Sequence, residues 1–175
     1  MTEVANSNQL MAGKRGLVLG IANDHSIAYG IARALHGAGA ELALTYQGDG
    51  FLKRVEPLAQ TLDCGLLMPC DVTDPDSLDA LFAAISDKWG GLDFLVHAIA
   101  YSDRAELSGR YLDTTRENFV QTLSISCFSF TDLARRASEL MTDGGAMVTL
   151  SFLGAHRVMP SYNVMGVAKA ALETS

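Results

Sequence analysis

Hydrophobic and polar positions form a repeated pair of patterns, a short apolar run followed by a segment with apolar residues at helical spacing. The apolar runs predict strands at residues 15–21, 40–47, 64–72, 92–100 and 144–155. The helical spacing predicts helices at 26–39, 51–62, 74–90 and 114–141, and a last one that carries Tyr162 and Lys169. Pro57 is expected to interrupt the second helix, and Asp74 and Pro75 to begin the third.

The predicted strands are almost continuously apolar, as in parallel sheets whose two faces are both covered by helices. Strands that alternate with helices therefore predict an α/β fold, a Rossmann-like doubly wound parallel sheet. No linker composition divides residues 12–175, so we expect one domain there. Residues 1–11 are polar and predict a flexible N-terminal arm.

Composition and charge argue against several functional classes. The formal net charge is -7 and the sequence pI is about 4.9, which disfavours a nucleic-acid binder. No apolar run reaches the length of a membrane span, and the histidines lack the spacing of metal ligands, so we expect neither a membrane nor a metal partner. Three cysteines without a C-x-x-C pair predict a reducing, cytoplasmic setting.

The first strand runs directly into a loop and helix that could bind an anion. Gly20 ends the strand, Ser26 opens the helix, and Gly30 lies about one turn further on. Helix amides at the carboxyl edge of a parallel sheet suit a dinucleotide pyrophosphate. The loop is longer than G-x-G-x-x-G, and an ordinary strand-to-helix turn with Ser26 as its cap is an equally open interpretation.

The ends of the next two strands bear on the choice of nucleotide. Gln47 can hydrogen-bond a neutral ribose and brings no charge to a 2′-phosphate, which favours NADH over NADPH. The cations Lys53 and Arg54 lie close in sequence and keep NADPH open. Asp71 could accept a hydrogen bond from an adenine amino group, or it could only cap the turn toward Asp74.

Tyr162 and Lys169 are seven positions apart, close to two full turns of a helix, so both side chains are expected on one face. A hydroxyl and an ammonium aimed at one spot could stabilise an enolate oxygen and support proton donation. Lysine stems beside surface tyrosines also occur at this spacing without any chemistry.

These segments together resemble the bacterial NADH-dependent enoyl-acyl-carrier-protein reductases, a divergent branch of the short-chain dehydrogenases. The resemblance is carried by "GLVLGIANDHSIAYGIA" (16–32), "TYQ" (45–47), "CDV" (70–72), "HAIAYS" (97–102) and "LSFLGAHRVMPSYNVMGVAKAALE" (150–173). Ordinary short-chain dehydrogenases use Tyr-x3-Lys, whereas six residues separate Tyr162 from Lys169 here. The resemblance implies that 12–175 is a dinucleotide-binding domain with strand order 3-2-1-4-5, C-terminally incomplete and lacking the family's sixth and seventh strands.

The resemblance also implies residue roles. NAD-contacting positions of the family match Gly20, Ser26, Ile27, Gln47, Asp71, Val72 and Ile99. Lys169 matches the lysine that binds the nicotinamide ribose, Tyr162 the tyrosine that acts on the thioester, and Ser102 a position beside the substrate carbonyl. Two positions depart from the family: Phe152 replaces a second tyrosine, and Ala100 a glycine. We expect the Phe152 ring to point into the cavity near Tyr162.

The implied reaction is the reduction of a trans-2-enoyl thioester of acyl carrier protein by hydride from NADH, in a cytoplasmic homotetramer. Two alternatives remain open. One is a carbonyl reductase or alcohol dehydrogenase of the wider short-chain superfamily. The other is an incomplete chain that binds nucleotide without turnover.

Overall fold

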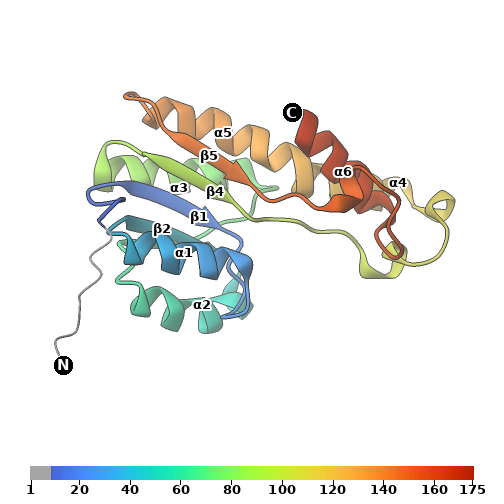
Figure 1. The fold of residues 1–175 in the computed structure, drawn as a ribbon, viewed down its shortest axis with the longest axis horizontal. Coiled ribbons are helices and arrows are strands. Elements are labelled where there is room, and N and C mark those ends of the chain that lie inside the picture. Colours follow the sequence, from blue (N-terminus) through green and yellow to red (C-terminus); the bar gives the residue numbers. More distant parts are fainter. Residues whose placement is uncertain (1–8) are drawn as a thin grey trace.

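The computed structural model describes residues 9–175, and all five expected strands form within this range. They are β1 (Arg15–Leu19), β2 (Glu41–Tyr46), β3 (Leu66–Pro69), β4 (Phe94–His97) and β5 (Ala146–Thr149). Every pairing is parallel and the order is β3-β2-β1-β4-β5, so the predicted sheet and its strand order are confirmed (Figure 1).

The strands are shorter than their apolar runs, mostly because the chain leaves the sheet early at the carboxyl ends. The fifth differs most, since β5 ends at Thr149 and a short 3-10 helix, Leu153–Ala155, follows. Apolar residues beyond a strand end can pack in loops, so apolarity alone overestimates strand length.

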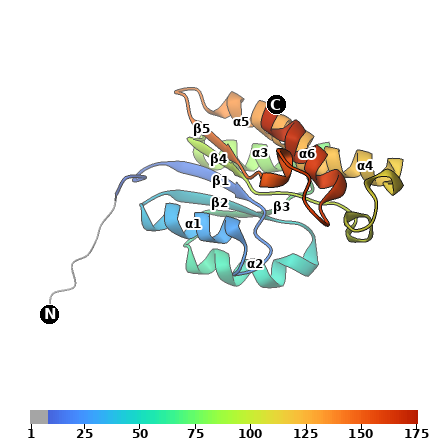
Figure 2. The same cartoon turned by 45° about the vertical axis from the view of Figure 1, so that its right-hand side comes forward.

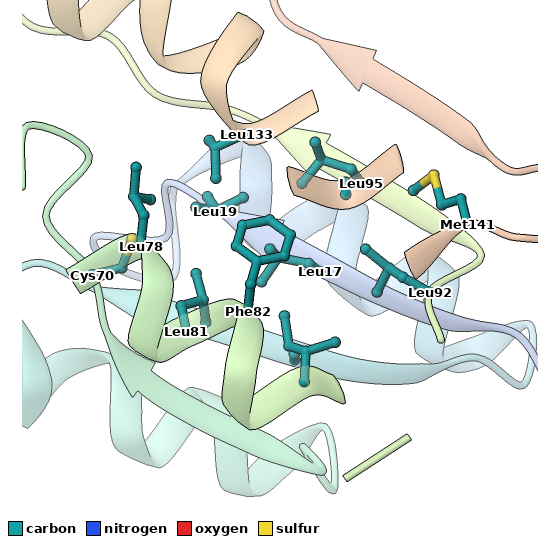
Figure 3. Close-up of a cluster of buried hydrophobic side chains, with 13 residues drawn as sticks. Leu17, Leu19, Cys70, Leu78, Leu81, Phe82, Leu92, Leu95, Leu133 and Met141 are labelled. Carbon is teal, nitrogen blue, oxygen red and sulfur yellow. The ribbon is translucent and has the colours of Figure 1, made fainter. Parts of the chain in front are cut away.

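Helices α1 (Ile27–Gly37) and α2 (Asp49–Thr61) cover one face of the sheet, and α3 (Pro75–Trp89) and α5 (Ser129–Leu140) cover the other (Figure 1). Each face buries its own apolar cluster. We call the cluster between the sheet, α3 and α5 the sheet core (Figure 3). It contains Leu17, Leu19, Ala43, Cys70, Leu78, Leu81, Phe82, Ile85, Leu92, Leu95, Leu133, Ala137 and Met141.

Helix starts and breaks follow local chemistry with one exception. Asp74 caps α3 by accepting a hydrogen bond from the Asp76 amide at 3.0 Å, and Pro75 is its first residue, as predicted. The expected interruption at Pro57 is wrong, because α2 continues through it to Thr61. Val55 and Ala59 are buried on either side of the proline, and their packing offsets its missing hydrogen bond.

The long helix expected at 114–141 is present but not uniform. It consists of α4 (Arg116–Leu123), a π-helical turn at Ser124–Phe128, which we call the π turn, and α5. The last helix, α6 (Asn163–Thr174), packs against α4 and the π turn (Figure 2). Two short 3-10 helices, Arg104–Leu107 and Tyr111–Asp113, lie in the loop that precedes α4.

Residues 1–8 of the expected N-terminal arm lie outside the described residues. Met11, at the end of that arm, donates its amide to the Ala38 carbonyl at 2.8 Å and packs on the cluster under α1 and α2. Among residues 9–175, no helix combines the length and the apolar character that crossing a bilayer requires.

Candidate functional site

A cavity of about 500 Å³ opens at the carboxyl ends of the central strands. Four of the residues expected to contact a cofactor line it: Gly20 after β1, Gln47 after β2, Val72 after β3 and Ile99 after β4. The remaining lining residues are Ile21, Ala22, Thr45, Tyr46, Phe51, Cys70, Ala98, Ala100, Tyr101, Gln121 and Ile125. The cavity therefore lies where the order of strands reverses between β1 and β4.

Gly20 is required by its surroundings. Its φ of +101° lies in the left-handed region that favours glycine, and an added Cβ would come within 2.1 Å of the Ala98 carbonyl oxygen. Only a residue without a side chain lets the ends of β1 and β4 approach this closely, and that approach forms the floor of the cavity.

The two residues after the first loop are placed differently from Gly20. The Ser26 hydroxyl accepts hydrogen bonds from the amides of Ala22 at 3.0 Å and Asn23 at 3.1 Å. It shapes the loop and makes no side-chain cap bond to α1. Ile27 begins α1 and is largely exposed although it is apolar. Neither residue is part of the cavity lining.

Asp71 closes the turn that follows β3. Its carboxylate accepts hydrogen bonds from the Thr73 amide at 2.8 Å and the Thr73 hydroxyl at 2.7 Å. The bonds from Thr73, with a smaller contribution from the Gln47 amide, lower the pKa of Asp71. The turn-capping interpretation of Asp71 therefore describes its contacts here, and Gln47 is its neighbour at the cavity.

The outer wall of the cavity comes from a region that sequence patterns did not indicate. Gln121 on α4 and Ile125 in the π turn line the cavity. The Ser126 hydroxyl accepts from the Tyr101 amide at 2.9 Å and donates to the Tyr101 carbonyl at 3.0 Å, which fixes the loop after β4. A π turn leaves no signature in hydrophobic periodicity, so the sequence predicted one continuous helix over 114–141.

The Ser102 side chain lies away from the cavity lining. Its hydroxyl accepts a hydrogen bond from the Thr122 hydroxyl at 2.9 Å and donates one to the Asn118 side chain at 3.3 Å. Asn118 and Thr122 are both buried on α4. These bonds tie the loop after β4 to α4.

Tyr162 occupies a close-packed position that we call the tyrosine seat, formed by Phe152, Gly154, Tyr162 and Gly166. A Cβ added to Gly154 would lie 2.4 Å from the Tyr162 ring, and one added to Gly166 would lie 2.8 Å from the Gly154 carbonyl oxygen. The two glycines thus admit the ring between the loop and α6. Burial raises the pKa of the Tyr162 phenol, and its hydroxyl makes no hydrogen bond within residues 9–175.

Phe152 lies in the tyrosine seat, with its ring centroid 4.9 Å from that of Tyr162 and the two planes tilted by 59°. The expected proximity to Tyr162 is therefore present. The Phe152 ring is about half exposed and is absent from the lining of the large cavity. It is also absent from a second cavity of about 460 Å³ that Tyr162 itself lines, so the expectation that the ring points into the cavity near Tyr162 is wrong.

Lys169 is buried on α6, and its ammonium donates to the Leu150 carbonyl at 2.7 Å. Burial lowers the pKa of Lys169. Tyr162 and Lys169 are not hydrogen-bonded to each other within the described part of the chain. The two-turn argument fails at one end, because Tyr162 precedes α6 and has a non-helical backbone, with φ -122° and ψ -29°.

A third group of residues joins the loop after β5 to α6. Glu173 accepts from the Ser151 hydroxyl and pairs with His156, whose Nε2 lies 2.6 Å from the Glu173 carboxylate. In the described residues, no three His, Cys, Asp or Glu side chains gather as metal ligands would. The contacts of Glu173 hold the loop that leads from β5 to Tyr162.

Comparison with known proteins identifies relatives over nearly the whole chain. A family model described as "Enoyl-(Acyl carrier protein) reductase" matches residues 20–175. Enoyl-[acyl-carrier-protein] reductase [NADH] 2 of Rhizobium meliloti (strain 1021) is 61% identical over 168 residues, which cover 96% of this chain and 63% of that relative. The chain thus spans less than two thirds of the length of that curated relative.

Two solved structures are also similar. The enoyl-(acyl-carrier-protein) reductase of Anaplasma phagocytophilum in complex with NAD is 55% identical, with a TM-score of 0.92, and the match covers 94% of this chain and 63% of that one. The Bacillus cereus enoyl-acyl carrier protein reductase with NADP+ and indole naphthyridinone is 47% identical, with a TM-score of 0.93 and coverage of 95% and 65%.

Proposed function

This chain belongs to the enoyl-[acyl-carrier-protein] reductase family, and we propose that it serves the NADH-dependent reduction of a trans-2-enoyl thioester of acyl carrier protein. The observation that carries the proposal is the cavity at the reversal of strand order, since open α/β sheets bind ligands at this point. The alternative carbonyl reductase of the wider short-chain superfamily shares this feature, so the substrate must be tested directly.

The cavity has room for much of a dinucleotide. Its volume is about 500 Å³, and the absent side chain of Gly20 lets the ends of β1 and β4 approach and form the cavity floor, where we propose that the pyrophosphate binds. Gln47, Val72 and Ile99 line it beside Gly20. We propose that Ser26, Ile27, Asp71 and Lys169 complete the binding site from its rim. The bound cofactor would supply the hydride.

Tyr162 and Lys169 would divide the remaining work. Because the Tyr162 hydroxyl has no partner within residues 9–175, it is free to donate to a thioester oxygen as negative charge develops there. The Lys169 ammonium has three protons and gives one to Leu150, so two remain for a ribose. We propose Ser102 and Phe152 as neighbours of the substrate.

The reaction is tested by following NADH oxidation with crotonyl thioester and, separately, with ketones. Turnover of the thioester alone supports the proposal, whereas turnover of ketones alone supports the carbonyl-reductase alternative. Binding of NADH without turnover of either substrate supports the third possibility, a chain that only binds nucleotide.

Substitutions then separate chemistry from binding. Tyr162→Phe should keep NADH affinity and lower kcat about 100-fold or more, as the loss of an oxyanion-stabilising donor does. Lys169→Ala should lose both NADH affinity and activity. Near wild-type turnover of Tyr162→Phe would show that another group stabilises the enolate.

Cofactor preference follows from Gln47. A 2′-phosphate would lose hydration beside a neutral amide and gain no charged partner. We therefore expect the affinity for NADH to be at least about 10-fold higher than that for NADPH. Fluorescence titration with both nucleotides measures the ratio. Equal or tighter binding of NADPH would indicate that Lys53 or Arg54 reaches the phosphate.

We further propose that the protein is cytoplasmic and forms a homo-oligomer, a tetramer by family resemblance. Large apolar side chains are exposed on three neighbouring elements: Val120 on α4, Phe128 in the π turn and Val167 on α6. Sedimentation equilibrium measures the assembly, and a monomer at micromolar concentration would contradict it.

A further inference from the structure

His97 is fully buried at the end of β4, and the proposed chemistry does not use it. Both of its ring nitrogens have side-chain partners. Nδ1 lies 2.8 Å from the Thr149 hydroxyl at the end of β5, and Nε2 lies 2.8 Å from the hydroxyl of Ser129, the first residue of α5. The imidazole therefore links the ends of two strands to the start of a helix.

The direction of these bonds follows from Ser129. Its single proton is donated to the Ile125 carbonyl at 2.6 Å, so its oxygen must accept from His97 Nε2–H. Burial, together with the nearby Lys169 charge, lowers the pKa of His97 to about 4. The neutral ring then has a lone pair on Nδ1, and Thr149 must donate to it. The chain of donors runs from Thr149 through His97 and Ser129 to Ile125.

One end of this series of hydrogen bonds reaches Lys169. Leu150 follows Thr149, and its amide donates to the His97 carbonyl at 3.3 Å. The Leu150 carbonyl accepts the Lys169 ammonium. His97 therefore fixes the peptide that Lys169 binds, through the Thr149 side chain on one side and the Leu150 amide on the other.

The other end of this series of hydrogen bonds reaches the cavity wall. Ile125 is in the π turn and lines the cavity, and the next residue, Ser126, holds Tyr101 at both its amide and its carbonyl. The bond from Ser129 to the Ile125 carbonyl secures the π turn from the α5 side.

We infer that His97 is a positioning residue, which places the Lys169 ammonium through Thr149 and Leu150, and the π turn through Ser129. The effect on cofactor affinity rests on the proposed function. The hydrogen-bond direction rests on the contacts and on the neutral state of the buried ring, and the placement of Lys169 rests on the contacts.

The first test is heteronuclear NMR of the chain at pH 7, where the buried His97 imidazole is neutral. The His97 imidazole should carry its proton on Nε2 and none on Nδ1. A proton on Nδ1 would reverse the donor chain and overturn the inference. The same sample reports on Lys169, because the chain has only four lysines, Lys14, Lys53, Lys88 and Lys169, and selectively labelled side chains give a simple spectrum.

The second test removes the hydrogen bond between Thr149 and His97. Thr149→Val keeps the side-chain shape but has no proton for His97 Nδ1. It should shift the Lys169 side-chain resonance and weaken NADH binding about fivefold, the effect of losing one partly buried hydrogen bond. Ile85→Val is the control: it removes a buried methylene from α3 and should change neither readout. An unchanged Lys169 resonance in Thr149→Val would overturn the inference.

Two conservative variants of His97 separate positioning from mere filling of space. Asparagine places its amide near Nδ1 and can keep the Thr149 arm, whereas glutamine reaches the place of Nε2 and can keep the Ser129 arm. The Lys169 side-chain resonance should therefore shift less from its wild-type position in His97→Asn than in His97→Gln. Equal shifts in both would mean that His97 only packs.

These readouts separate two failures. If the wild-type chain binds no NADH, the proposed function fails, and the imidazole tautomer and the Lys169 resonance still decide the inference. If NADH binds and Thr149→Val leaves both affinity and resonance unchanged, the inference fails and the proposed function stands.

Discussion

The sheet core and the tyrosine seat are built on opposite principles. The sheet core consists mainly of leucines and other apolar side chains that remove their surface from water, and most of its members come from the sheet, α3 and α5 (Figure 3). The tyrosine seat depends on side chains that are absent, because Gly154 and Gly166 leave the space that the Tyr162 ring occupies. We therefore expect a substitution in the core mainly to lower stability, and a substitution in the seat mainly to displace the Tyr162 phenol.

The largest expected effect is in the sheet core. Leu81→Ala removes a fully buried side chain on α3 and should lower the free energy of unfolding by about 2–5 kcal/mol. Leu112→Ala makes the same chemical change at a residue that is 83% exposed and should stay within about 0.5 kcal/mol. Urea denaturation measures both. Similar losses in the two variants would mean that burial does not govern stability here.

A smaller effect, with a matched control of opposite sign, is expected in the tyrosine seat. Gly154→Ala should destabilise the chain by about 1–3 kcal/mol, because the new methyl overlaps the Tyr162 ring. Gly37→Ala meets nothing within 4 Å at the end of α1 and should stabilise by about 0.5–1 kcal/mol. Thermal unfolding and the near-ultraviolet tyrosine signal report the two outcomes. A Gly154→Ala variant that is more stable than the wild type would contradict the claim that Gly154 makes room for the Tyr162 ring.

A third, weaker effect depends on pH at the cavity. The lowered pKa of Asp71 means that its contribution to stability is present above the unfolded value, about 4, and is lost as pH falls through the lower folded value. Asp71→Asn should therefore destabilise at pH 7 and not at the lowest pH. Solvent screening limits the difference to about 1 kcal/mol or less.

The control is Asp143→Asn, at an exposed carboxylate that has no hydrogen bond within residues 9–175. This substitution should leave the free energy of unfolding unchanged at both pH values. A pH-independent loss in Asp71→Asn would instead indicate that its shape, and not its charge, closes the turn after β3.

The smallest effect on stability is expected for Phe152→Tyr. The ring is half exposed, so a phenol hydroxyl can reach solvent and unfolding should change by less than about 0.5 kcal/mol. The apparent KM for crotonyl thioester should change more than the free energy of unfolding, because the added donor lies beside Tyr162. A large loss of stability without a change in KM would place Phe152 in the packing of the seat alone.

The same contrast explains what the sequence could predict. Apolar runs and helical spacing indicated every strand and major helix, and the ends of the first two strands indicated Gly20 and Gln47, which both line the cavity. The alternation of strands and helices suffices for these two residues, because the carboxyl ends of parallel strands meet at one edge. Val72 and Ile99 also line the cavity, but only the family resemblance implied them.

The remaining parts of the site depend on tertiary contacts that have no pattern in sequence. The burial of His97 between Thr149 and Ser129 joins residues that are distant along the chain. The π turn and the glycine spaces around Tyr162 are local, but hydrophobic periodicity does not indicate them. Helical arithmetic also failed for Tyr162 and Lys169, because it assumes that both residues are inside the helix, whereas Tyr162 precedes α6. Pro57 shows the reverse case, in which packing overrides a local signal.

The π turn also contains one residue more than a continuous α-helix needs. It uses five residues, Ser124–Phe128, where an α-helix uses about four, so the loss of one residue there would restore ordinary α-helix and leave α5 close to its present rotation. Ser129 would stay beside His97 and Leu133 in the sheet core, whereas Ile125 and Ser126 would shift at the cavity wall. A deletion inside α5 would instead turn every later residue of that helix by about 100°. The cavity wall can therefore change at this turn without a change of frame in α5.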